Sequence, residues 1–159
     1  MVSLNLHTTD LGFGVTKEAR VFANLWEKVL NEYLREFSYM GSCANLEFNL
    51  ILKGDSIGMI WSGYDDSMPN YIDETLSKVK AMPNADLKQE FEQGKQKLLQ
   101  DWNNSYMVQS YQQMFTLFGA TVVKNSFENA ELRAILETYT FEMFTDQLKS
   151  WLVNGRYQW

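Results

Sequence analysis

The feature that most constrains this fold is a change of hydrophobic period between residues 46 and 69. Two short runs there alternate apolar and polar residues, which is the two-residue period of a β-strand. A turn cluster of Lys, Gly, Asp and Ser at 53–56 joins them, so the segment predicts an antiparallel hairpin. Pro69 ends this pattern, and a helical period begins at once. The residues expected to face the helices are Leu46, Phe48, Leu50 and Leu52.

A long apolar stripe before the hairpin predicts one amphipathic helix of about six turns. Thr16 is its expected N-cap, and Gly41 is its expected C-cap. The stripe consists of Phe22, Leu25, Trp26, Val29, Leu30, Tyr33, Leu34 and Phe37.

Further helices are predicted after Pro69, the first of them stopping at Pro83. Gly94 falls inside the second, where we expect close packing against a neighbouring helix, with a kink as the alternative. The apolar stripes of these helices begin at Ile72, Leu87, Tyr111, Leu132 and Phe141. Their expected N-caps include Asn84 or Asp86, then Ser126 and Thr140.

The order of elements predicts a single two-layer α+β domain over residues 1–159. A strand at 2–7 and the hairpin at 46–64 would form a small, mostly antiparallel sheet, with the helices on one face. Residues 156–159 are expected to be extended. Ile51 and Ile60 have the opposite register, so the other face should be partly apolar.

Composition restricts the partners and the compartment. A net charge of −6 argues against nucleic acid and anionic membranes, which require basic patches. No apolar run approaches the length of a membrane span, and no secretory signal is visible, so no membrane insertion is expected. A single cysteine, Cys43, excludes an internal disulfide and favours an intracellular, reducing compartment, either cytosol or mitochondrion.

The sequence contains no recognisable catalytic, cofactor-binding or metal-binding set. His7 is the only histidine, so neither His-Glu-x-x-His nor His-x-x-Glu-His can occur. Cys43 is expected to be a buried structural thiol rather than a nucleophile paired with His7. The acidic pairs at 65–66 and 73–74 lack a cation-loop spacing and are expected at the start of the helix after Pro69.

Several motifs, in this order, resemble the insulinase (insulin-degrading enzyme, pitrilysin) family of zinc metallopeptidases. They are Leu30-Asn31-Glu32-Tyr33, Tyr39-Met40-Gly41, Gly63-Tyr64-Asp65-Asp66-Ser67-Met68-Pro69, Leu98 to Asn104, and Gln109-Ser110-Tyr111-Gln112-Gln113. The resemblance is to the third of four homologous domains, the middle domain, and covers nearly the whole chain. It departs from the family at Ser110, where proline is common, and at 66–68, where the usual lysine is missing.

The resemblance implies a domain without the catalytic zinc, because the family's zinc motif lies in its first domain. In the family, the third domain shares the fold of the first and forms part of the wall of an enclosed substrate chamber. The family also continues into a closing strand at the point where this sequence ends, which implies an open sheet edge near Trp159.

Two functions follow from this resemblance. The first is a non-catalytic structural or interaction subunit of a larger assembly, as in relatives that lost their zinc ligands and became core subunits of mitochondrial complexes. The alternative is a fragment or separate-chain partner of an active zinc peptidase, forming part of its chamber wall. A self-contained enzyme of unrecognised chemistry is the third and remotest possibility. Exposed strand edges and aromatic residues favour partner binding, so the interface candidates are Arg156, Tyr157, Trp159, Ile51 and Ile60.

Overall fold

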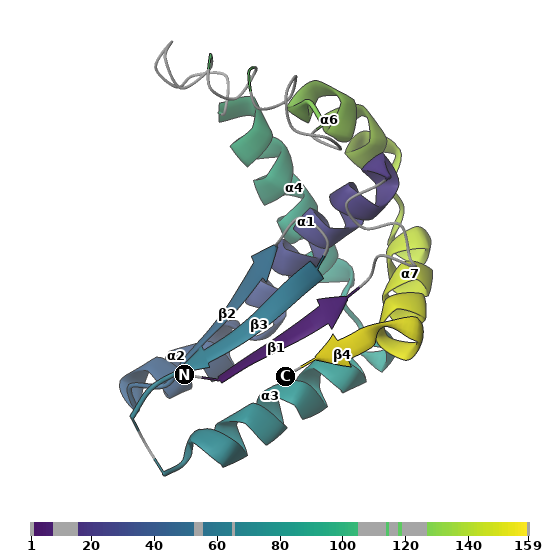
Figure 1. Cartoon of the computed structure of the whole chain (residues 1–159). Helices are drawn as coiled ribbons and strands as arrows, with labels where there is room; N and C mark the ends of the chain where they lie inside the picture. Colours follow the sequence, from purple (N-terminus) through teal and green to yellow (C-terminus); the bar gives the residue numbers. More distant parts are fainter. Residues whose placement is uncertain are drawn as a thin grey trace.

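A computed structural model describes residues 2–7, 16–52, 56–64, 66–104, 114, 118 and 127–158. It is a two-layer α+β domain in which helices pack behind a four-stranded antiparallel sheet (Figure 1). The strands are β1 (Val2–His7), β2 (Glu47–Leu52), β3 (Ser56–Ser62) and β4 (Arg156–Gln158), in the spatial order β2-β3-β1-β4. The helices are α1 (Lys17–Tyr33), α2 (Arg35–Cys43), α3 (Met68–Ala81), η2 (Met82–Asn84), α4 (Lys88–Asn104), α6 (Asn129–Thr138) and α7 (Phe141–Asn154).

The register of the sheet confirms the predicted hairpin and its inner face. Phe48 of β2 lies opposite Trp61 of β3, and Leu50 lies opposite Met59. Leu4 of β1 also lies opposite Met59. Because directly opposed residues share a face, these side chains all lie on the side covered by helices. Leu4, Met59 and Trp61 are buried, and this face forms part of the main core.

The prediction of one long helix before the hairpin is wrong in one respect, because the segment forms two helices. Leu34, with φ −92° and ψ 5°, separates α1 from α2. Its N–H still donates to the carbonyl of Leu30, and its carbonyl accepts from Ser38, so the chain turns without losing these bonds. Gly41 is not the C-cap but lies inside α2; the turn that follows is made by Asn45, at φ 56°.

The other predicted helix ends are mostly confirmed. Thr16 caps α1 and Thr140 caps α7, each accepting a backbone N–H. Pro69 lies in the first turn of α3, and Asp86 accepts the N–H of Lys88 at the start of α4. The N-cap of α6 is Glu128, whereas Ser126, predicted for that role, lies outside the described residues. The apolar stripe predicted to begin at Tyr111 also lies outside the described residues, apart from Met114 and Phe118, which are exposed.

α1 is the central strut of the core. Phe22 and Trp26 are fully buried, and both contact Trp151 of α7, with ring centroids 4.5 and 6.4 Å away. On its other side α1 packs against α4 at Gly94, where an added Cβ would lie 3.0 Å from Val29 Cγ2. The expected close packing at this glycine is therefore confirmed.

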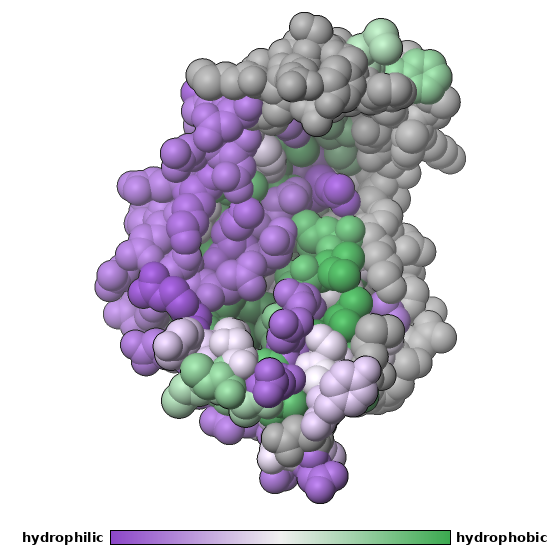
Figure 2. All heavy atoms as spheres, turned by 90° about the vertical axis from the view of Figure 1, so that its left-hand side faces the viewer, coloured by the Kyte–Doolittle hydropathy of each residue, from purple (hydrophilic) through white to green (hydrophobic). Residues whose placement is uncertain are grey.

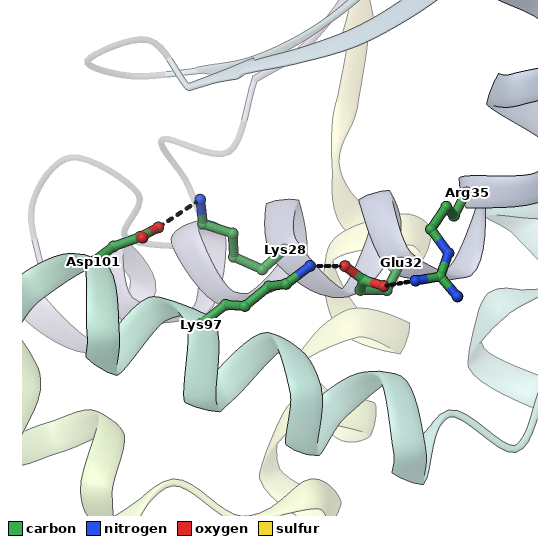
Figure 3. A network of polar contacts seen from close by, with 5 residues as sticks. All are labelled: Lys28, Glu32, Arg35, Lys97 and Asp101. Atoms are coloured by element: carbon green, nitrogen blue, oxygen red, sulfur yellow. Dashed lines mark hydrogen bonds and ion pairs between the residues drawn. The ribbon is translucent and has the colours of Figure 1, made fainter.

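A polar network joins the surfaces of the same two helices (Figure 3). Lys28 of α1 lies 3.0 Å from a carboxylate oxygen of Asp101 on α4. One turn further along α1, Glu32 binds Lys97 of α4 and accepts from Arg35 at 3.2 Å. The Glu32 side chain is only 8% exposed, and these two cations offset the cost of burying its carboxylate. The network fixes the relative position of α1 and α4 beside the apolar contact at Gly94.

Candidate interaction surface

The two isoleucines proposed for an interface lie on the outer face of the sheet. Ile51 is 43% exposed on β2, and Ile60 on β3 is partly buried. Their partners across the ladder are Gly58 for Ile51 and Asn49 for Ile60, so the isoleucines are diagonal neighbours. The other outward positions described on β2 and β3 carry Glu, Asn, Ser or Gly. This face therefore offers a small apolar spot in polar surroundings.

The C-terminal candidates lie at a sheet edge. Arg156 and Tyr157 belong to β4, which pairs antiparallel with β1 and places Tyr157 opposite Leu6. The predicted extension of this segment is thus confirmed for 156–158. Trp159 lies outside the described residues. In the strand order β4 is the outermost strand, next to β1 alone.

The opposite edge, β2, is incompletely covered on its inner side. Phe48, Leu50 and Leu52 are only partly buried, whereas the β3 residues opposite them are fully buried. The β2 and α4 side of the molecule, turned toward the viewer in Figure 2, shows hydrophobic residues gathered in a hollow beside a broad hydrophilic surface. β2 and β4 are the outer strands of the sheet, and each has one edge that does not pair within the sheet.

A third exposed group was missed by the sequence analysis. Tyr39 and Met40 of α2 are 71% and 64% exposed, and Tyr64 after β3 is fully exposed. Met40 lies about five turns after Phe22, so a continuous helix would have placed it on the buried stripe. The break at Leu34 changes the helical phase and leaves Met40 in solvent. Tyrosine and methionine are enriched at protein interfaces, which was the available sequence signal.

The zinc of the peptidases that this chain resembles does not fit the residues present. His7 is the sequence's only histidine, and its backbone pairs with β3 and β4. Among the residues that the structure describes, no three His, Cys, Asp or Glu side chains are grouped to hold a metal ion. Cys43, expected to be buried, is instead exposed at the last position of α2.

Asp66, Asp73 and Glu74 are exposed, but none of them caps α3 or lies in its first turn, where the acidic pairs were expected to act. Asp66 is exposed and precedes the N-cap Ser67, so the first turn of α3 holds no acidic residue. Asp73 and Glu74 come a turn later, where Glu74 lies 4.0 Å from Lys78. Asp65 lies outside the described residues.

Of the helices described, none combines the length and apolar character needed to cross a membrane.

Solved structures share this fold. Pitrilysin aligns with 93% of the chain at 15% identity and a TM-score of 0.73, and the chain spans only 16% of pitrilysin. A conserved protein from Enterococcus faecalis V583 aligns with 98% of the chain at 14% identity (TM-score 0.64), the chain spanning 37% of it. A structure described as an M16-like peptidase from Alicyclobacillus acidocaldarius aligns with 92% at 11% identity (TM-score 0.61), the chain spanning 36% of it.

The sequence itself decides the family. A comparison with curated proteins found no match. Residues 1–135, most of the chain, match the family model for the middle or third domain of peptidase M16, in agreement with the motifs at Glu32, Gly41 and Gly63. The chain therefore belongs to the middle-domain family of the M16 peptidases, the insulinase family.

Proposed function

We propose that this chain is a non-catalytic M16 middle domain that acts as a structural and interaction unit of a larger protein assembly. The observation that carries the proposal is the family match to a middle domain over residues 1–135, in a sequence with one histidine. The solved relatives support it, because in each of them this fold is a minor part of a longer chain. A single cysteine suits a reducing compartment, either cytosol or mitochondrion.

The contact with the assembly is proposed at the sheet. The C-terminal segment with Arg156, Tyr157 and Trp159 would meet a partner at the β4 edge, where unpaired backbone groups can add a strand. Ile51 and Ile60 would add apolar contact on the outer face. Other domains of a peptidase or separate protein subunits could supply the partner surface.

A second candidate function is that of a chamber-wall component of an active zinc peptidase whose zinc is held by another polypeptide or another part of the protein. The likeness to pitrilysin and to an M16-like peptidase favours it. The two functions differ in whether peptidase activity accompanies the assembly.

Size-exclusion chromatography of native extract, with zinc and peptidase assays on each fraction, separates these candidates. A large complex without zinc supports the structural unit, and co-elution with a zinc-bearing peptidase supports the chamber-wall role. The purified chain should hold no stoichiometric zinc and hydrolyse no peptide. About one zinc per chain, lost in His7→Ala, would contradict both candidates.

The proposed contact residues are tested by two variants of the full chain. Deleting residues 156–159 should reduce the sedimentation coefficient of the native assembly. Ile51→Lys should weaken assembly, whereas Gln93→Lys, at an exposed position of α4 outside the sheet, makes the same change of charge and serves as the matched control. Unchanged sedimentation in the deletion and in Ile51→Lys would place the partner elsewhere on the domain.

A further inference from the structure

A groove of about 510 Å³ lies on the helical side of the domain, away from the outer sheet face. Its walls come from the end of α3, from η2 and from the last turns of α7, and Leu4 of β1 also lines it. The apolar lining residues are Leu4, Leu76, Pro83, Leu152 and Val153, and the polar ones are Lys80, Asn84 and Lys149. An apolar lining with a few polar groups is the usual character of a binding site.

Two ammonium groups at this groove have no ion-pair partner among the described residues. Lys80 is on α3 and Lys149 is on α7, so each of the two helical walls carries one ammonium group. Neither makes an ion pair among the described residues, although the chain has a net charge of −6 and six of its other Lys and Arg residues are paired. Asp146, one turn before Lys149, does not pair with it. An occupant with carboxylates would therefore complement the groove.

The shape of the groove favours a polypeptide over an enclosed small molecule. Val153 is 80% exposed, so one wall is open to solvent, whereas small-molecule sites bury most of the ligand surface. α7, which forms one wall of the groove, leads through Gly155 directly into β4, the strand at the proposed contact.

We infer that this groove receives a segment of the partner polypeptide in which aliphatic side chains are flanked by carboxylates. The aliphatic side chains would pack on Leu76, Leu152 and Val153, and the carboxylates would pair with Lys80 and Lys149. This inference rests on the proposed function for the existence of a protein partner, and it adds the chemistry of the segment that docks.

Binding of defined peptides to the full chain tests the groove directly. The probe is a blocked, fluorescein-labelled peptide with the core Asp-Leu-Leu-Glu, compared with versions carrying Asn and Gln for the acids or Gly for the leucines. Methyl NMR of Leu76, Leu152 and Val153 reports the site. We expect saturable shifts with the acidic leucine peptide, and about tenfold weaker binding in Lys80→Glu and in Lys149→Glu.

Lys88→Glu is the matched control, because Lys88 is exposed, makes no ion pair among the described residues and does not line the groove. It should leave peptide affinity within about twofold of the parent. Equal binding of the neutral peptide, or equal weakening by Lys88→Glu, would overturn the inference. Oleate shifting the same methyl groups, with no shift from the peptide, would also overturn it and indicate an amphiphile site.

Photo-cross-linking in the native assembly distinguishes this inference from the proposed function. A benzophenone amino acid at position 153 should cross-link to a segment rich in Asp or Glu and aliphatic residues, identified by mass spectrometry. Cross-links from position 51 but none from 153 would retain the proposed function and reject the groove. No assembly at all would reject the proposed function, and peptide binding would still decide the groove.

Discussion

Tyr71 of α3 lies directly on Gly41 of α2. A Cβ added at Gly41 would be 2.6 Å from the Tyr71 Oη atom and 2.7 Å from its Cε2. The Tyr71 ring cannot retreat easily, because it is buried and stacked on Phe37, with centroids 4.9 Å apart and planes 11° apart. The absence of a side chain at Gly41 therefore sets how closely α2 and α3 approach.

Gly41→Ala should lower the free energy of unfolding by about 1–3 kcal/mol, since overpacking outweighs the better helix propensity of alanine. Urea denaturation measures the change. In a Tyr71→Ala background the same substitution should become neutral or stabilising, because the ring is gone. A stabilising Gly41→Ala in the parent chain would show that α3 can shift freely.

Trp26→Ala should cost roughly 3–5 kcal/mol of stability, because Trp26 is fully buried between Phe22 and Trp151. For a domain of ordinary stability this is enough to unfold a large fraction of molecules. Trp26→Phe is the informative companion, since the indole N–H has no partner among the described residues. Trp26→Phe should lower the free energy of unfolding by about half as much as Trp26→Ala, or by less. A urea midpoint unchanged in Trp26→Ala would contradict the central role of α1.

Glu32→Gln should reduce stability by about 1–2 kcal/mol, because its nearly buried carboxylate binds two cations that the amide cannot pair with equally. The loss should shrink at high salt. Glu137→Gln removes the exposed pair with Arg133 and should cost less than about 0.5 kcal/mol. Equal effects of the two substitutions would mean that the α1–α4 network contributes no more than a surface pair.

Stability should fall in alkali through Tyr139. Burial raises the pKa of Tyr139 above the ordinary phenol value of 10.0. Between that value and the raised pKa, the unfolded chain has lost the proton while the folded chain keeps it, so unfolding becomes easier as pH rises. The stabilisation that depends on a neutral, buried Tyr139 side chain is therefore fully present below pH 10 and is lost as the pH rises above that value.

Urea midpoints measured from pH 9 to pH 11.5 test this. Tyr139→Phe should give a shallower alkaline decline, by up to about 1.4 kcal/mol for each pH unit above 10. Tyr39→Phe, at an exposed position, should leave the decline unchanged. Parallel declines in the parent and Tyr139→Phe would assign the effect to other groups.

The sequence by itself determined most of the elements and the family, because both depend on local patterns. Alternation at Phe48 and Met59 decides which strand residues face the core, and Thr16 and Thr140 satisfy the N–H groups at their own helix starts. The motif at Glu32 likewise indicates the family from the sequence alone, without reference to the three-dimensional structure. The proposed contact residues Ile51 and Ile60 were placed on the outer face by the same alternation, since strand side chains point to alternate sides.

Only the tertiary structure decided the features that depend on contacts between distant segments. The break at Leu34 follows no local signal; it changes the helical phase, brings Gly41 under Tyr71 and leaves Met40 and Cys43 exposed. The pairing of β4 with β1 joins the two ends of the chain. The groove likewise requires α3 and α7 to meet beside Leu4, three segments whose proximity no local period encodes. Such contacts arise from packing, in which a neighbour's shape overrides local propensity.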